Sequence, residues 1–295
     1  MLKEQTLFGE VDKVQIAIER IRAFEPPDGF ILAFSGGKDS QLVYHLAKEA
    51  GVKFEAHFHL TTVDPPEVIY FVRDHYPNVI FDRPEITMWD LIVRKKMPPT
   101  RRIRYCCEYL KEGFGMGRTV ITGVRWEEST RRKKNRSLLE LNAYSKERIM
   151  LNNDNAEARR MFEVCTLKGK HILNPVIDFT VDEVWEYLNS RGIPHCCLYD
   201  ECFRRIGCVG CPMSGSKGMR REFERWPKYY DAYLRAFDRM LKARMQAGLK
   251  SERWPNAQAV MDWWINGRKA VTEELDDGQY DFLIEDESDQ GLQMM

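Results

Sequence analysis

The chain has 295 residues, of which 45 are basic and 45 acidic, so its formal net charge is zero. Hydrophobic residues make up 43% of it, which is enough for one large α/β domain with an appendage or for two domains. The sequence has no run of 18 apolar residues and no signal-peptide pattern, so we expect a cytoplasmic protein without a membrane partner. In that compartment the eight cysteines indicate thiols or metal ligands rather than disulfides.

The charges are distributed unevenly along the chain. Residues 271–295 contain nine acidic residues and no lysine or arginine, which leaves the rest with 45 basic and 36 acidic residues, a net charge of +9. Two basic clusters comprise Arg94, Lys95, Lys96, Arg101, Arg102 and Arg104, and Arg125, Arg131, Arg132, Lys133, Lys134 and Arg136. A basic body suits a polyanion such as a nucleic acid, but solvated surface loops explain the clusters equally well. The acidic tail is either solvated or shields this body.

Helices and strands are predicted to alternate along the first two thirds of the chain. A first helix has Val11, Val14, Ile18 and Ile21 on one face and ends before Pro26-Pro27. Strands are predicted at 30–34, 53–60, 79–81 and 118–124, and helices at 41–50, 65–76 and 89–93 and from a capping box at 180–183. This alternation predicts an α/β fold with a doubly wound, mostly parallel sheet.

The remaining third has a helical pattern. It covers 219–249, where Trp226-Pro227 should break the helix, and a short helix follows at 257–265. The aromatic residues of this region, among them Trp263 and Trp264, fit a packed core better than a base-stacking surface. We therefore expect an α/β domain at 1–213, a helical C-terminal extension at 214–272 and a weakly ordered acidic tail at 273–295.

The most informative segment links a buried strand directly to an amphipathic helix. It contains Ser35, Gly36, Gly37, Lys38, Asp39 and Ser40. The glycines let a polyphosphate approach the backbone, the helix N-terminus attracts anions, and the lysine and serines add a positive charge and hydroxyl donors. Asp39 could cap the helix or reach Mg²⁺ through water. The string is neither a Walker A motif nor G-x-G-x-x-G, and it disfavours the alternative of an ordinary strand-to-helix turn.

Three strand ends are expected to meet at one edge of the sheet. The first predicted strand ends at Ser35, the second at Thr61 and the fourth near 123–125. Ligands of open α/β sheets bind beyond the carboxyl ends of the strands. We therefore expect one binding site there.

Four cysteines fall into two pairs. Cys208 and Cys211 form a C-x-x-C motif, and Cys106 and Cys107 are adjacent. Two such pairs could bind zinc or a [4Fe–4S] cluster, and a C-x-x-C motif alone could be a redox dithiol.

The other cysteines have weaker patterns. Cys196-Cys197 and Cys202 lie shortly before the C-x-x-C motif, so Cys202 is a rival fourth ligand. Cys165 stands in an apolar stretch and is predicted to be a core residue.

The loop sequence S-G-G-K-D-S resembles the PP-loop of the ATP pyrophosphatase superfamily, whose members cleave ATP between the α and β phosphates. Segments 122–129, 174–185 and 205–212 resemble the phosphoadenosine-phosphosulfate (PAPS) reductase branch, and the resemblance covers about 28–213. It implies the adenine nucleotide alpha hydrolase-like fold and a loop that holds pyrophosphate. It also implies that Thr61 and Thr62 receive the adenine, with plain turn chemistry as the alternative, and that Gly123 and Arg125 belong to the nucleotide site.

The resemblance also bears on the cysteines. Iron–sulfur sulfonucleotide reductases hold a [4Fe–4S] cluster with a Cys-Cys pair and a later C-x-x-C motif, which Cys106, Cys107, Cys208 and Cys211 match. Those reductases need a nucleophilic cysteine in a tail motif E-C-G-x-H, whereas no cysteine follows Cys211 here. Their loop usually departs from S-G-G-x-D-S, whereas this chain keeps it with Lys38. Both departures favour ATP over a sulfonucleotide.

We therefore predict an ATP pyrophosphatase that transfers sulfur to nucleic acid, as in DNA phosphorothioation or tRNA thiolation. Its predicted catalytic residues are Lys38, Asp39 and Arg125, and its cofactors are ATP, Mg²⁺ and a [4Fe–4S] cluster. The alternatives are reduction of a sulfonucleotide to sulfite and a non-catalytic subunit that binds nucleotide and cluster. Expected partners are a nucleic-acid acceptor, a cysteine desulfurase or another sulfur donor, and a second copy of the chain in a homo-oligomer.

Overall fold

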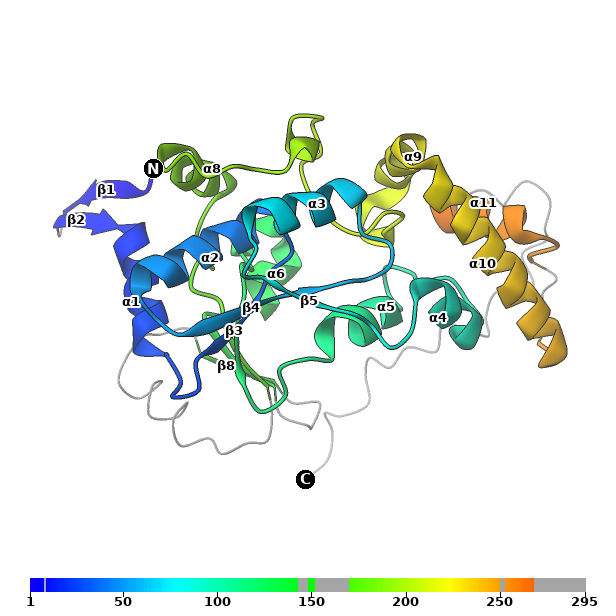
Figure 1. The fold of residues 1–295 in the computed structure, drawn as a ribbon, viewed down its shortest axis with the longest axis horizontal. Helices are drawn as coiled ribbons and strands as arrows, with labels where there is room; N and C mark the ends of the chain where they lie inside the picture. The colour runs from blue at the N-terminus through cyan, green and yellow to red at the C-terminus, as the bar shows by residue number, and fades with distance from the viewer. Residues whose placement is uncertain (8, 143–147, 152–169, 250–252, 268–295) are drawn as a thin grey trace, which may run out of the picture.

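A computed structural model describes residues 1–267 apart from residue 8 and segments 143–147, 152–169 and 250–252 (Figure 1). The predictions for Cys165 and the acidic tail fall outside the described residues. Among the helices of the described part, none is long and apolar enough to cross a membrane.

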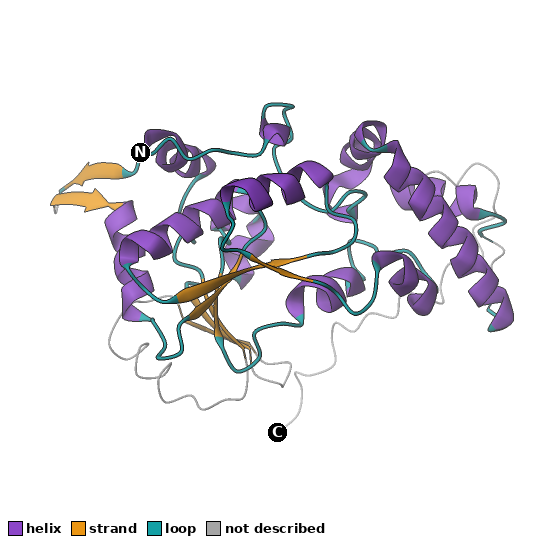
Figure 2. Cartoon of the chain, in the orientation of Figure 1, coloured by secondary structure: helices purple, strands orange, loops and turns teal. Residues whose placement is uncertain are grey.

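A mixed sheet forms the centre of the protein (Figure 2). Its described strands follow the order β5 (Ile80–Asp82), β4 (Phe54–His59), β3 (Phe30–Ala33), β6 (Thr119–Ile121), β9 (Lys170–Leu173), β7 (Leu139–Asn142) and β8 (Arg148–Leu151). The first five are parallel, whereas β7 runs antiparallel to both β9 and β8. The predicted mostly parallel α/β sheet is therefore confirmed.

Helices lie on both sides of this sheet, with α2 and α3 on one side and α4 and α5 on the other in Figure 1. The helices up to the C-x-x-C motif are α1 (Lys13–Ala23), α2 (Lys38–Ala50), α3 (Pro66–His75), α4 (Met88–Lys95), α5 (Tyr105–Cys107, continued by a π-helical turn at Glu108–Glu112), α6 (Thr130–Asn135) and α8 (Val181–Ser190). The predicted helical C-terminal region follows as α9 (Gly215–Arg225), α10 (Pro227–Gln246) and α11 (Ala257–Asn266). A separate hairpin, β1 (Lys3–Thr6) and β2 (Gly9–Asp12), precedes α1.

Local signals account for several helix ends. The Thr180 hydroxyl accepts a hydrogen bond from Glu183 N at 3.3 Å, and the Glu183 carboxylate accepts one from Thr180 N at 2.8 Å. This reciprocal pair confirms the predicted capping box at the start of α8. Pro227 begins α10 directly after α9, which confirms the predicted break.

The prediction that places Val11 in the first helix is wrong. Val11 pairs with Glu4 in the hairpin, and α1 begins only at Lys13. The Asp12 carboxylate accepts hydrogen bonds from Val14 N at 2.9 Å and Gln15 N at 3.1 Å, so it caps the helix and fixes its start. The strand predicted at 118–124 is also shorter, because the backbone beyond β6 turns toward the N-terminus of α2.

One hydrophobic core contains residues of both the sheet and the C-terminal helices. Phe30 in β3 and Phe237 in α10 are fully buried members of it. The rings of Tyr233 and Trp264 lie 4.7 Å apart inside it, which confirms Trp264 as a core residue. Trp263 is half-buried and packs against Trp254 at 5.0 Å.

Candidate active site

The loop between β3 and α2 is closed tightly by its own hydrogen bonds. The Ser40 hydroxyl accepts a hydrogen bond from Ser35 N at 3.2 Å and donates one to Gly37 O at 2.8 Å. Gly36 has φ +70°, and a Cβ there would lie 2.8 Å from Cγ2 of Val72 and within 3 Å of α3. Only glycine fits this position, and Gly37 precedes α2 without a side-chain cap.

The three predicted catalytic residues form one charged group. Asp39 accepts from Lys38 Nζ at 2.9 Å and from Arg125 Nε at 2.7 Å. The Arg125 side chain is only 3% exposed and also bonds Glu127 at 2.8 Å. Burial opposes the charge of Arg125, but its two carboxylate partners raise its pKa. Two cations therefore share one carboxylate at the edge of the loop.

Gly123 explains how the end of β6 reaches this group. A Cβ on Gly123 would lie 2.6 Å from Asp39 O, so the two backbones are in direct contact. The predicted convergence of the first and fourth strand ends is therefore present in the structure. It depends on a glycine at this position.

The end of β4 carries the two predicted adenine-binding threonines. Thr61 is 1% exposed, and its amide donates to Asp64 at 2.6 Å. Thr62 has φ +65°, an uncommon value for a residue other than glycine, and its hydroxyl accepts from Met88 N at 3.0 Å. A cavity of about 290 Å³ lies beside this turn, lined by Leu60, Thr62, Asp64, Ile69, Arg83, Pro84 and Tyr229. Both hydroxyls already have partners, so recognition of a base here would use the backbone and the cavity walls.

The C-x-x-C motif is fixed to the same strand end. Val209 N donates to Val63 O at 2.8 Å, and the Cys208 thiol donates to the Thr61 hydroxyl at 3.4 Å. The Glu222 carboxylate in α9 accepts from Gly210 N at 2.7 Å. Sheet and C-terminal helices thus hold the motif from two sides.

The two cysteine pairs interact with each other. The charges of Cys208 and Cys211 contribute to raising the pKa of Cys106, after its hydrogen bond to Cys107 and burial. That hydrogen bond, together with the Arg104 guanidinium 3.2 Å away, lowers the pKa of Cys107 to about 6. The structure therefore places the two cysteine pairs close enough for their charges to interact.

The geometry of this thiol group differs from that of a site for one ion. Among the described residues, no three His, Cys, Asp or Glu side chains converge to hold a single metal ion. The rival ligand Cys202 is exposed in the turn after the 3₁₀ helix Cys197–Tyr199, with φ +61°.

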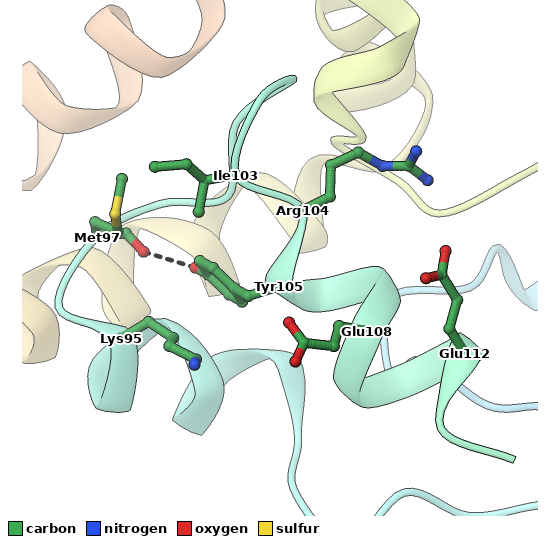
Figure 3. Close-up of a pocket in the computed structure, with 7 residues that line it drawn as sticks. All are labelled: Lys95, Met97, Ile103, Arg104, Tyr105, Glu108 and Glu112. Atoms are coloured by element: carbon green, nitrogen blue, oxygen red, sulfur yellow. Dashed lines mark hydrogen bonds between the residues drawn. The ribbon is translucent and has the colours of Figure 1, made fainter. Parts of the chain in front are cut away.

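An open cavity of about 540 Å³ lies beside the helix that carries Cys106 and Cys107 (Figure 3). Its lining residues are Lys95, Met97, Ile103, Arg104, Tyr105, Glu108 and Glu112. The Tyr105 hydroxyl donates to Met97 O at 2.6 Å and so joins the loop after α4 to the start of α5. Arg104 belongs both to the wall of this cavity and to the surroundings of Cys107, whose thiol lies 3.2 Å from its guanidinium.

The basic clusters are partly structural. Arg125 is buried at the phosphate loop, and Arg101 Nε donates to Pro212 O at 3.1 Å. Arg132 pairs with Glu128, and its pKa is lowered by burial and by the positive charge of Arg205. Positive charge therefore accumulates between the loop and the thiols.

Several residues of the site carry no sequence pattern that assigns them. Tyr199 bonds Lys38 N at 2.9 Å, and Lys111 interacts with Cys208, whose charge raises its pKa. Glu222 lies beyond the motif-bearing part of the chain. Tyr199 and Lys111 depend on contacts between segments distant in sequence, and Glu222 contacts the motif from the next helix, so local patterns could not reveal them.

The sheet topology and the phosphate-binding loop define a PP-loop nucleotide-binding protein of the α/β class. The phosphoadenosine phosphosulfate reductase domain family matches residues 29–214. The chain belongs to that family, which confirms the predicted family and fold. It is therefore a member of an enzyme family that binds nucleotides and acts in sulfur chemistry.

Individual relatives are distant. The chain is 22% identical over 213 residues to the adenosine 5′-phosphosulfate reductase of Staphylococcus haemolyticus, covering 68% of this chain and 78% of the relative. It is 24% identical over 235 residues to the enzyme of that name from Bacillus cereus, covering 74% and 89%. A crystal structure of phosphoadenylyl-sulfate reductase from Candida auris aligns with a TM-score of 0.43 at 13% identity, over 65% of this chain and 87% of that one. The names of the two bacterial relatives support the sulfonucleotide alternative better than the predicted sulfur transfer to nucleic acid.

Proposed function

We propose that this chain binds an adenosine 5′-phosphosulfate-type sulfonucleotide and reduces it to AMP and sulfite. The observation that carries the proposal is that the phosphate loop and the cysteine pairs lie at the same edge of the sheet. Thr61 at the end of β4 contacts Cys208, and the charges of Asp39 and Arg104 both act on Arg132. A nucleotide phosphate on the loop would therefore direct its sulfo group toward the thiols.

Lys38 and Arg125 have the charge that cleavage of such a nucleotide needs. Both now neutralise Asp39, and both would exchange this carboxylate for the oxygens of the nucleotide. Positive charge fixed in a buried site stabilises the negative charge that develops on the leaving phosphate. The carboxylate of Asp39, once released, is a suitable oxygen ligand for Mg²⁺.

The reaction balances with two thiols. A thiolate attacks the sulfur, an S–S bond forms, and the S–O bond breaks with AMP as the leaving group. A second thiolate then attacks the sulfur atom of the first thiol. The S–S bond to the sulfo group breaks, sulfite leaves, and the two thiols end as a disulfide. We assign both thiols to an external dithiol protein, which supplies the two electrons of the reduction.

The thiol group fits a [4Fe–4S] cluster in its donor chemistry. Cys106, Cys107, Cys208 and Cys211 would each bind one iron, which does not require three ligands to converge on one ion. When bound, the cluster would supply an iron–thiolate centre beside the sulfo group.

ATP cleavage between the α and β phosphates is a second candidate. It is favoured by the intact S-G-G-K-D-S loop and by the absence of a cysteine after Cys211. Lys38 and Arg125 would serve pyrophosphate as they would sulfate. Sulfur transfer to a nucleic-acid acceptor, with a desulfurase as donor, remains a prediction attached to this candidate.

The test is to incubate anaerobically purified protein with adenosine 5′-phosphosulfate and a dithiol, and separately with ATP and Mg²⁺. Release of sulfite and AMP supports the proposal, and an Arg125→Ala variant should lose it. Release of AMP and pyrophosphate from ATP alone would replace it with the second candidate. Binding of either nucleotide without turnover would identify a non-catalytic subunit.

A further inference from the structure

The N-terminus of α2 is covered by a side chain from a distant loop. Tyr199 accepts a hydrogen bond from Lys38 N at 2.9 Å, across 161 positions of sequence. A Cβ on Gly37 would lie 3.4 Å from the same phenol oxygen. The phenol oxygen therefore occupies the place where an oxygen of a bound anion would accept from the first amide of the helix.

The Tyr199 ring is held by aromatic neighbours. Trp185 packs edge-on against it at 5.0 Å and 89°, and His195 lies 6.1 Å away. Burial raises the pKa of Tyr199, so its hydroxyl keeps its proton at neutral pH. A neutral phenol can both accept and donate a hydrogen bond.

The loop around Tyr199 is anchored without help from the phenol. Gln41 in α2 donates to Pro194 O at 2.7 Å, and His195 pairs with Asp200 at 2.9 Å. Arg221 in α9 donates to Cys202 O at 3.1 Å. The loop and the ring can therefore stay in place while the hydroxyl of Tyr199 changes its hydrogen-bond partner.

We propose that Tyr199 is a further substrate-binding residue, whose hydroxyl accepts a hydrogen bond in the free protein and donates one to the bound substrate. It accepts from Lys38 N when no anion is bound. It then yields this amide to a phosphate or sulfate oxygen and donates its own hydroxyl to the same anion. The proposal rests on nucleotide binding at the phosphate loop, and it assigns the residue that recognises the anionic end of the nucleotide.

The experiment measures binding of inorganic pyrophosphate and of adenosine 5′-phosphosulfate to the full chain by calorimetry. The variants are Tyr199→Phe and, as the matched control, Tyr230→Phe, whose hydroxyl contacts Gln258 in α11 instead of the loop. Loss of a hydrogen bond to a charged group predicts about tenfold weaker binding of both ligands to Tyr199→Phe. Tyr230→Phe should bind as the unmodified chain does, and all three should unfold in one cooperative transition well above the temperature of the titration.

Trp185 supplies a second readout that a purely structural role would not change. Pyrophosphate should alter its fluorescence in the unmodified chain, because a negative charge arrives beside the phenol that packs against its ring, and the signal should be absent from Trp185→Phe. Equal or tighter binding by Tyr199→Phe would mean that the phenol only blocks the loop, which overturns the proposal. If the unmodified chain binds neither ligand, both the proposed function and this inference fail.

Discussion

The phosphate loop depends on backbone contacts that leave no room for a side chain. Gly123 and Asp39 meet so closely that a Cβ on Gly123 would lie 2.6 Å from a carbonyl oxygen and 2.8 Å from its carbon. These are main-chain atoms at the start of α2, so they cannot rotate away as a flexible side chain could. The position of Lys38 and Asp39 is therefore set from outside the loop, by the turn after β6.

A Gly123→Ala substitution should displace the start of α2 and with it the charged group. Misplacement by about 1 Å costs up to about 100-fold in a well-oriented site, so we expect binding of ATP or adenosine 5′-phosphosulfate to weaken by about 10- to 100-fold. Calorimetric titration measures this directly. The control is Gly113→Ala, where the nearest atom would lie 3.6 Å away and φ is −72°. Unchanged affinity in Gly123→Ala would show that the contact does not position the loop.

Strand β4 contains two histidines on one face, both directed at the same carboxylate. His57 lies 2.8 Å and His59 3.5 Å from Asp82. The His59 ring also packs against Phe114 with centroids 3.7 Å apart. Burial, opposed by Asp82 and reinforced by the charges of His57 and Lys170, lowers the pKa of His59 to about 4.

This shift predicts that the protein loses stability in mild acid. Between pH 6.5 and 4 the unfolded chain binds a proton at His59 that the folded chain does not, so the free energy of unfolding falls as the pH falls. The loss between pH 7.5 and 5 should be about 2 kcal/mol. Urea unfolding at both pH values measures it, and His59→Gln should reduce the difference while His75→Gln, at an exposed position, should not. An equal pH dependence in all three proteins would contradict the assignment.

The elements show which features a sequence can reveal. The capping box at Thr180, the break at Pro227 and the glycine loop are local signals, and each appears in the structure where the sequence predicts it. The apolar spacing of Val11 fits a helix, but Asp12 caps α1 and Val11 pairs with Glu4, so Val11 belongs to the hairpin. The antiparallel strands β7 and β8 have no such local signal, because strand direction is set by tertiary pairing.

The candidate site divides in the same way. Lys38, Asp39 and Arg125 could be named from motifs, and the structure joins them through one carboxylate. Tyr199 and Glu222 could not, because each acts through a contact with a segment that is distant or follows the motifs. Sequence patterns thus identify the groups that carry charge but miss the groups that position them.

Across the whole molecule, the C-terminal helices support the thiol group even though α9, α10 and α11 all lie outside the segment that matches the family. Tyr233 in α10 donates to Val209 O at 3.0 Å, and Glu222 in α9 accepts from Gly210 N and from the Ser214 hydroxyl. Gly210 has φ +72°, and a Cβ there would lie 2.7 Å from the ring of Phe223. Contacts with these helices therefore determine the conformation of the C-x-x-C loop.

Replacing Glu222 by alanine should loosen this loop. The substitution leaves Gly210 N without its acceptor, and an unpaired buried amide costs about 1–3 kcal/mol in the free energy of unfolding. Chemical denaturation measures the loss. Glu224→Ala, at an exposed position of the same helix, should have nearly the free energy of unfolding of the unmodified chain. A loss of equal size in this control would show that any alanine substitution in α9 destabilises the protein.

The two cysteine pairs are separated by about 100 residues of sequence, and the fold alone brings them together through β4, α5 and α9. If they hold a [4Fe–4S] cluster, Cys208→Ser removes one of its four ligands and should abolish most bound iron and sulfide in protein purified without oxygen. Cys202→Ser is the decisive comparison, because Cys202 is the rival ligand and lies exposed in a different turn. It should retain iron, sulfide and colour. If Cys202→Ser loses iron and Cys208→Ser retains it, Cys202 is the ligand and the assignment is reversed. If both variants retain iron, the C-x-x-C motif does not bind a cluster.

Cys208 also contacts Thr61 at the nucleotide edge of the sheet. Loss of the cluster should therefore weaken nucleotide binding as well, and calorimetry on the same samples measures that coupling.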